Sequence, residues 1–197
     1  LERVAAQDGV ERAALSIRHP YQGGQGSAPF TAEQTQQELW RGKGEVAYST
    51  AVGPNFFAYV AAKSLEGPDF TEEDKAGAPK VAIVNRNLAH RLWPSGGAMG
   101  SCLFFSELEG CYRVIGVLGG VWKLQALKRD KMTVYVPLAQ ATEAVPGALL
   151  VRTRGSVGPM LAPLRSTVQS VVPNLPAVTV ARARDLVAGE FRPWRLG

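Results

Sequence analysis

Short runs in which apolar and polar residues alternate recur along the chain, and apolar residues at helical spacing lie between them. Alternation over a strand length predicts β-strands, and apolar residues three and four positions apart predict helices. Strands are therefore predicted over Val10–Arg18, Glu45–Val52, Lys80–Val84, Ser101–Phe105, Cys111–Leu118, Thr133–Pro137, Ala148–Arg152 and Ala177–Val180. Helices are predicted over Phe56–Ala61, from Thr71 onward, over Arg86–Trp93, between Val157 and Val171, and from Arg182 to about Phe191.

Polar residues and prolines mark where several of these elements begin and end. Asn55 and Asn85 are each placed to cap the helix that follows. Pro94 ends the helix that starts after Asn85, because the residue before a proline avoids helical backbone. Pro163 is expected to delay or kink its helix, because proline lacks the amide that an interior position donates. The Thr71 side chain and the acids after it suit the first turn of a helix.

The order of the predicted elements is mixed. Strands and a helix alternate at the front, hairpins occupy the middle, and strand, helix and strand follow again at the end. This order predicts an α+β fold. We expect two lobes, one built from both chain ends (residues 1–70 and 145–197) and one inserted between them (residues 71–144).

The composition is that of an ordinary folded protein. Hydrophobic residues make up 46% and charged residues 20% of the 197 positions, which is too apolar for a disordered chain. No run approaches the roughly 18 apolar residues that a membrane-spanning helix needs. The chain starts at Leu1 rather than at Met and lacks the pattern of a signal peptide, so we expect it to be a piece of a longer protein.

The formal net charge of +5 raises the question of nucleic-acid binding. The charges are not arranged for it, because acids cluster between Glu66 and Asp74 while bases gather at Lys123–Lys131 and from Arg182 onward. No basic stripe is interleaved with aromatic residues, and no zinc-finger, homeodomain or RNA-binding motif occurs. We therefore predict no nucleic-acid partner and interpret the basic positions as solvated.

The glycines that follow Val81–Trp93 raise the question of a phosphate-binding loop. Such a loop places glycines where a helix begins, as in Gly-x-Gly-x-x-Gly or Gly-x-x-x-x-Gly-Lys-Ser/Thr, and neither motif occurs. Gly96, Gly97 and Gly100 instead come after the predicted helix, where the helix dipole repels anions. They are interpreted as capping and turn glycines, and no cofactor site is predicted.

Histidine, serine and carboxylate patterns predict no catalytic site. His90 has no histidine partner one helical turn away and His19 precedes a proline, so no zinc-binding pair is formed. No Gly-x-Ser-x-Gly motif marks a nucleophilic serine. Asp69 and Asp74 could share acid–base work, but a solvated acidic turn is the preferred interpretation. We predict no catalytic residue, no metal ligand and no enzymatic activity.

The two cysteines lie on the two arms of the predicted hairpin. If the arms pair around Ser106–Gly110, the side chains of Cys102 and Cys111 come within bridging reach. Closing so short a loop would stabilise the fold by about 2–3 kcal/mol on chain-entropy grounds. The alternative is two buried thiols in a cytosolic protein. The hairpin placement favours a disulfide, and with it an oxidising compartment.

Several runs together resemble the extracytoplasmic domain of MacB/FtsX-type ABC transporter permeases. The longest lies between Val52 and Pro94 and includes Gly-Pro-Asn-Phe-Phe, Glu-Gly-Pro-Asp-Phe-Thr-Glu-Glu-Asp and Leu-Ala-His-Arg-Leu-Trp-Pro. Residues Ala98–Cys102, Tyr112–Val117 and Val134–Gln140 continue the likeness, which covers nearly the whole chain in order. The chain looks most like the predicted permeases of acidobacteria and related bacteria. It departs at turns, as where Gly119-Gly-Val stands in place of Gly-Asp-Val.

The resemblance implies a porter-like lobe of βαβ units formed by both chain ends, with the smaller mixed α/β lobe inserted. Some family members carry a matching cysteine pair, which supports a disulfide between Cys102 and Cys111. The domain would lie in the periplasm, between the first and second membrane helices of an inner-membrane permease. Arg192, Trp194 and Arg195 fit a segment at the membrane interface, and the alternative is a plain cationic tail.

The function implied by the resemblance is mechanical and not catalytic. The domain would couple ATP-driven motion of membrane helices to export or to other work outside the membrane, with ATP bound by a separate cytoplasmic domain or subunit. Expected partners are a second permease copy, forming a dimer, and a periplasmic adaptor or a lipoprotein. Two other classes stay open: a free-standing extracytoplasmic binding or adhesion module, and an enzyme whose site follows no known motif.

Overall fold

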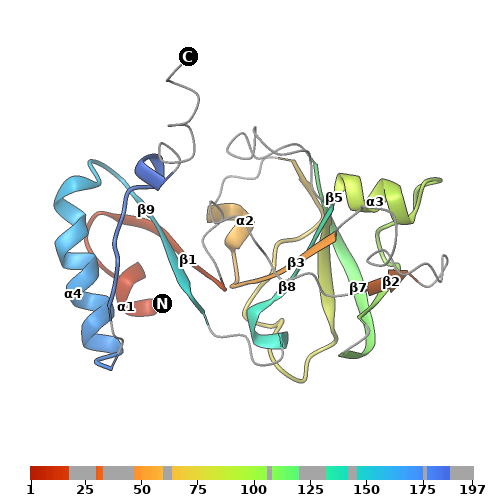
Figure 1. The fold of residues 1–197 in the computed structure, drawn as a ribbon, viewed down its shortest axis with the longest axis horizontal. Coiled ribbons are helices and arrows are strands. Elements are labelled where there is room, and N and C mark those ends of the chain that lie inside the picture. The colour runs from red at the N-terminus through yellow and green to blue at the C-terminus, as the bar shows by residue number, and fades with distance from the viewer. Residues whose placement is uncertain are drawn as a thin grey trace, which may run out of the picture. The chain divides into compact units, whose positions relative to one another are not determined.

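A computed structural model describes residues 1–17, 30–32, 47–59, 64–105, 108–119, 132–141, 146–174 and 177–186 (Figure 1). The helices are α1 (Glu2–Ala5), α2 (Phe56–Tyr59), α3 (Arg86–Leu92) and α4 (Leu161–Val171), with the 3-10 helices η2 (Leu138–Gln140) and η3 (Gly158–Met160). The strands are β1 (Val10–Ser16), β2 (Phe30–Ala32), β3 (Ala47–Val52), β4 (Leu65–Glu66), β5 (Val81–Asn85), β6 (Cys102–Phe105), β7 (Leu108–Leu118), β8 (Met132–Pro137) and β9 (Ala148–Thr153). Helices combined with a sheet of parallel and antiparallel pairs confirm the α+β class.

Contacts divide the chain into two units. Unit 1 comprises Leu1–Ala13 and Leu149–Gly197, and unit 2 comprises Ala14–Ala148. Strand β1 begins in unit 1 and ends in unit 2. The lobes predicted above (residues 1–70 with 145–197, and 71–144) were drawn from the order of elements, and their boundaries stay a prediction.

Unit 2 is built on a mixed sheet with β5 in its interior. Strand β5 pairs in parallel with β7 and antiparallel with β8, and β8 pairs in parallel with β3. Strand β6 pairs antiparallel with β7 and with β2, β4 adds to β7, and β1 reaches β3 at Ser16 and Val52. Residues Val81–Val84 are all buried because β5 has a strand on either side and side chains packed on both faces.

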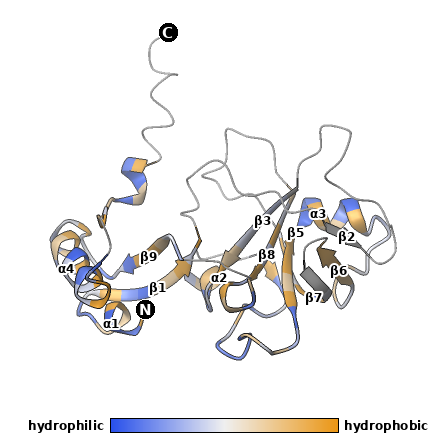
Figure 2. Ribbon diagram, turned by 60° about the horizontal axis from the view of Figure 1, so that its bottom comes forward, coloured by the Kyte–Doolittle hydropathy of each residue, from blue (hydrophilic) through white to orange (hydrophobic). Residues whose placement is uncertain are grey.

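The two faces of this sheet are covered by different elements. On one face, Leu88 of α3 is buried in the same cluster as Val84 of β5 and Val134 of β8. Side chains alternate along a strand, so Tyr135 points to the opposite face. There its ring meets Phe57 of α2 edge-on, with the ring centroids 4.9 Å apart. The hydropathy colouring of Figure 2 shows apolar residues along the strands between these helices.

Asn85 holds the junction between β5 and α3. Its Oδ1 accepts the Leu88 amide at 3.1 Å, which confirms the predicted cap. The same oxygen accepts the amide of Thr133 on β8 at 3.0 Å. The predicted helix is confirmed and ends at Leu92, one residue before the C-cap Trp93. One side chain therefore orients the helix and ties its start to the neighbouring strand.

Unit 1 has a small core of its own. Val4, Val10 and Leu164 are buried, with partly buried apolar side chains of β9 and α4 packed against them. Strands β1 and β9 are hydrogen-bonded neighbours, and the Arg154 amide donates to the Gly9 carbonyl at 2.9 Å. The expected delay at Pro163 is confirmed, because the segment begins as η3 and becomes α-helical only at Leu161. Pro163 thus falls in the first turn, where a missing amide costs little.

Three local predictions are wrong. Thr71–Asp74 forms a single turn and no helix, because its capping hydrogen bonds are followed closely by Gly77 and Pro79. Asn55 has a left-handed backbone (φ 57°) in place of the extended backbone of a cap. Residues Ala177–Val180 keep alternating burial, but no strand pairing is assigned to them within the described residues.

The last predicted helix begins where expected. Residues 183–186 are helical, and the Asp185 and Leu186 amides donate to the Arg182 carbonyl at 2.9 Å and 3.3 Å. The continuation to Phe191 lies outside the described residues. So do the predicted interface residues Arg192, Trp194 and Arg195, and so does His19. No helix among the described residues is long and apolar enough to cross a membrane.

Candidate functional site

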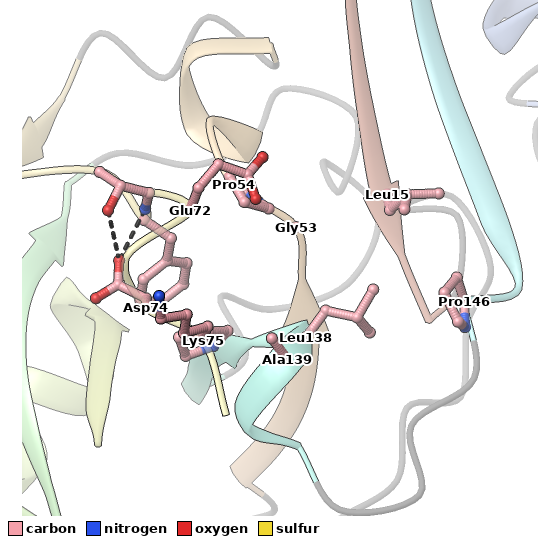
Figure 3. A pocket seen from close by; sticks show the side chains of 12 residues that line it. Leu15, Gly53, Pro54, Glu72, Asp74, Lys75, Leu138, Ala139 and Pro146 are labelled. Atoms are coloured by element: carbon pink, nitrogen blue, oxygen red, sulfur yellow. Dashed lines mark hydrogen bonds between the residues drawn. The ribbon is translucent and has the colours of Figure 1, made fainter. Parts of the chain in front are cut away.

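A pocket of about 240 Å³ lies in unit 2 where the parallel strands β3 and β8 end (Figure 3). Parallel strands end at the same edge of a sheet, so the turns that follow them converge there. The apolar lining is supplied by Leu15, Pro54, Phe70, Leu138, Ala139 and Pro146. Sequence reasoning missed this pocket, because its walls come from five segments that no local pattern connects.

The polar side chains of the pocket belong to one short loop. Asp74 Oδ2 accepts the Thr71 amide at 2.7 Å and lies 3.4 Å from the Thr71 hydroxyl, as the dashed lines of Figure 3 show. Thr71 Oγ1 in turn accepts the Glu73 amide at 3.3 Å. The Asp74 carboxylate therefore closes its own turn, while Glu72 and Lys75 are exposed at the rim.

Asp69 holds the neighbouring helix to this loop. Its Oδ2 accepts the amide of Ala58 in α2 at 2.8 Å, and its Oδ1 accepts the Phe70 amide at 2.7 Å. Burial raises the pKa of Asp69 above its ordinary value of 3.8. Backbone hydrogen bonds from Ala58, Phe70 and Phe57 lower the pKa, but burial has the larger effect. Asp69 thus takes the capping role that was predicted for Asn55. No local sequence signal connects it to a helix that lies eleven residues earlier.

An aromatic cluster underlies α2 and the pocket wall. Phe57 packs edge-on against Phe56 and Tyr135, with centroids 5.4 Å and 4.9 Å apart, and lies 6.1 Å from the Phe70 ring. Desolvation raises the pKa of Tyr135 to about 12, so its hydroxyl stays protonated at neutral pH. Phe70 is the ring of this cluster that lines the pocket, so the cluster supports the pocket from behind.

The sequence offers one carboxylate pair for acid–base chemistry, Asp69 and Asp74. Both carboxylates accept backbone amides in the structure. Each binds backbone amides of its own loop or of α2. Their hydrogen bonds hold the loop Phe70–Lys75 in place beside the pocket. Among the described residues, no group of three or more His, Cys, Asp or Glu side chains is placed to bind a metal ion.

His90 and the glycines that follow it belong to α3 and to the turn after this helix. His90 is exposed on α3. Gly96, Gly97 and Gly100 follow α3 with φ of 88°, 86° and 82°, which confirms them as turn glycines. The Gly100 amide donates to the Val114 carbonyl at 2.8 Å, so this turn is tied to β7. The glycines join a helix to a hairpin and do not surround a helix start.

A disulfide joins Cys102 and Cys111 across the predicted hairpin, with their Cα atoms 5.2 Å apart. Strands β6 and β7 pair with Leu103 opposite Tyr112, and their register shifts between Leu103 and Phe105. In this register Cys102 lies opposite Arg113. Cys111 lies two residues before Arg113, so it is the diagonal neighbour of Cys102 on the same face of the hairpin. The bridge therefore ties the two arms close to the bulge.

The mixed sheet and the disulfide-linked hairpin define an α+β domain with a covalently closed hairpin, and such bridges are typical of domains in oxidising compartments. The model of the MacB-like periplasmic core domain matches residues 4–185. The chain belongs to this family, whose members are periplasmic or extracellular domains of ABC-type transporters. No curated protein matches the chain.

Solved structures show the same fold. The periplasmic region of MacB from Actinobacillus actinomycetemcomitans is 13% identical with a TM-score of 0.59, over 86% of this chain and 71% of that one. The extracellular domain of the noncanonic ABC-type transporter YknZ from Gram-positive bacteria is 18% identical with a TM-score of 0.59, over 92% of this chain and 86% of that one. A domain of a putative permease protein from Porphyromonas gingivalis is 15% identical with a TM-score of 0.51, over 83% and 65%. At these identities the likeness concerns the fold alone.

Proposed function

We propose that the chain is the non-catalytic extracytoplasmic domain of a MacB-like ABC transporter permease, and that it transmits ATP-driven motion of membrane helices to export or mechanical work outside the membrane. The observation that carries the proposal is the family match over residues 4–185. The residue likeness described above supports the further proposal that the permease is of the acidobacterial type, with a porter-like lobe formed by both chain ends.

A part that transmits motion must be stiff, and unit 2 has features that support this role. Strand β5 is buried on both faces, Asn85 ties α3 to β8, and the Cys102–Cys111 bridge holds the hairpin. Closely packed interiors transmit displacement with little compression. The pocket beside the loop Phe70–Lys75 would then serve as a contact point and not as a reaction site.

The wider assembly follows from the same proposal. A cytoplasmic domain or subunit binds ATP, and this domain holds no cofactor. A second permease copy forms a dimer with the first, and a periplasmic adaptor or a lipoprotein is the partner outside the membrane. Arg192, Trp194 and Arg195 lie at the membrane interface in this arrangement.

The test is a distance measurement across the ATP cycle in the full-length permease with its ATPase. Exposed positions in each unit, Ser170 on α4 and His90 on α3, are replaced one at a time by cysteine and carry spin labels. Both variants keep the native disulfide. The label-to-label distance between the two copies is expected to change between the nucleotide-free and ATP-trapped states. An ATPase-inactive partner is the control, and distances that stay constant in both variants would contradict a mechanical role.

A free-standing binding or adhesion module remains the competing function, and the sequence on either side of the chain separates the two. Apolar runs of about 20 residues before Leu1 and after Gly197 support the permease. Polar sequence on both sides would leave the binding module as the better proposal.

A further inference from the structure

The charge of the chain is divided unevenly between its parts. The whole chain has 22 basic and 17 acidic residues, and residues 149–197 contribute seven Arg, Asp185 and Glu190 to these totals. The other 148 residues therefore hold 15 of each sign, so the entire net charge of +5 lies in the last 49 residues. Those residues contain no Lys, whereas the rest of the chain uses both Lys and Arg.

Three of these arginines come from two neighbouring segments of unit 1, the loop that leads to Gly158 and residues 182–184. A Cβ atom added to Gly158 would lie 3.2 Å from Arg182 Nη2, so the Arg182 guanidinium rests on the loop that Arg154 begins. Arg184 follows in the helical turn that starts after Arg182, whose carbonyl accepts the Asp185 amide at 2.9 Å. We call Arg154, Arg182 and Arg184 the arginine cluster.

The cluster is poorly neutralised by the residues around it. Arg154 and Arg182 have no carboxylate partner within the described part of the chain. Arg184 lies 3.6 Å from Asp185, but both side chains are exposed, and such pairs contribute little. The cluster therefore presents net positive charge to whatever lies against it.

We infer that the arginine cluster binds the phosphate groups of an anionic phospholipid surface. Arginine presents a planar fork of donors that pairs with two phosphate oxygens at once, which lysine cannot do. The sequence beyond the described residues continues with Phe191 and Trp194 among Arg192 and Arg195, and this mixture of aromatic and cationic residues suits a lipid interface better than an acidic protein. The inference rests on the proposed function, in which the chain end leads into a membrane helix.

The binding would orient the domain on the membrane from which it projects. Each arginine near an anionic surface strengthens binding by a factor of about five at low ionic strength. The cluster would therefore hold the end of unit 1 against the headgroups while unit 2, with nearly balanced charge, is not attracted to them. Motion of the membrane helices would then reach unit 1 directly.

Vesicle sedimentation with the 197-residue chain tests this inference. Vesicles of phosphatidylcholine with phosphatidylglycerol are compared with phosphatidylcholine alone, at about 50 mM and about 500 mM salt. Binding is expected only to the anionic vesicles at low salt. The variant Arg154→Gln/Arg182→Gln/Arg184→Gln should reduce it on the order of 100-fold. Its thermal unfolding midpoint is measured alongside, to show that the fold is kept.

A variant with the same change in net charge serves as the matched control. Lys75→Gln/Arg91→Gln/Arg113→Gln removes three exposed positive charges from unit 2 and should keep nearly full binding. Equal loss in both variants, or no binding to anionic vesicles, would overturn the inference. So would cluster-dependent binding to polyglutamate without binding to vesicles, which would point to an acidic protein partner. Each of these outcomes leaves the permease role standing, because that role is tested by flanking sequence and by distances in the full-length protein.

Discussion

Among the glycines that the structure describes, Gly67 is the one where a single methyl group should disturb the fold most. Its φ is 99°, and a Cβ atom there would lie 2.2 Å from the Ile115 carbonyl oxygen and 2.9 Å from Met99 Cε. Gly67→Ala therefore combines backbone strain with a clash against the main chain of β7. We expect a loss of about 2–4 kcal/mol in the free energy of unfolding, measured by urea denaturation.

Gly77→Ala is the matched control for this substitution. Gly77 also has a positive φ, 85°, but nothing lies within 4 Å of the added Cβ position. Only the backbone strain remains, and the expected loss is about 1–2 kcal/mol. Equal losses in the two variants would show that β7 yields to the methyl group and that the close approach at Gly67 is unimportant.

Asp69 should make stability depend on acid pH in an unusual direction. Its folded-state pKa is raised above 3.8, so the folded chain holds this proton more tightly than the unfolded chain does. The resulting stabilisation is present below pH 3.8 and is lost as the pH rises through the folded-state pKa. Asp69→Asn does not titrate. The free energy of unfolding of the native chain minus that of the variant should therefore fall as the pH rises from below 3.8 through the folded-state pKa of Asp69. A difference that rises over this range would show that the hydrogen bonds outweigh burial.

Among the elements, the β6–β7 hairpin depends on its disulfide. The loop that Cys102 and Cys111 close is short, and its loss should lower the free energy of unfolding by about 2–3 kcal/mol. Cys102→Ala/Cys111→Ala should show this loss without reductant. Reduction should destabilise the native chain equally and leave the double variant unchanged. Two reactive thiols in the denatured, unreduced native chain would rule out the bridge.

The junction between β5 and α3 depends on one oxygen atom. Asn85 Oδ1 accepts two amides, one from Leu88 and one from Thr133, so Asn85→Ala leaves both without this acceptor. We expect a loss of about 1–3 kcal/mol, more than an exposed helix cap contributes. Asn85→Asp keeps the acceptor and should recover most of the loss in the same urea titration. If both variants lose the same amount, the amide NH₂ of Asn85 matters more than its oxygen.

Elements with local causes were predictable from the sequence, whereas contacts between distant segments were not. The helix after Asn85, the hairpin and the delay at Pro163 each follow from a residue inside or next to the element. The cap of α2 was assigned to Asn55 because Asp69 is remote in sequence. At Thr71 a local pattern was misleading. Capping residues predict a helix there, but they close a single turn with no helix behind it. The pocket assembles from five segments, and no local pattern contains it.

At the scale of the whole molecule, the two units differ in how much apolar surface they bury. Among the residues that the structure describes, the main cluster of unit 2 contains 15 buried residues and that of unit 1 contains three. Burial of apolar surface is the dominant stabilising contribution, so the units should differ in local stability. Unit 1 also carries nearly all of the net charge, which adds repulsion within it. Unit 1, which is proposed to meet the membrane, is thus more easily deformed than unit 2, and the stiffness proposed for transmitting motion belongs to unit 2.

Native-state hydrogen exchange should resolve this difference. Amides of α4 are expected to open with a lower free energy than amides of β5 and β8, because α4 is held mainly by Leu164 and its few apolar neighbours. Leu164→Ala, at a side chain only 6% exposed, should speed exchange in α4 and leave β5 unchanged. Leu88→Ala is the counterpart in unit 2 and should lower the protection of β5 and β8. Equal loss of protection in α4 and β5 on Leu164→Ala would show that the chain unfolds as one cooperative body. Unit 1 could then not deform while unit 2 keeps its structure.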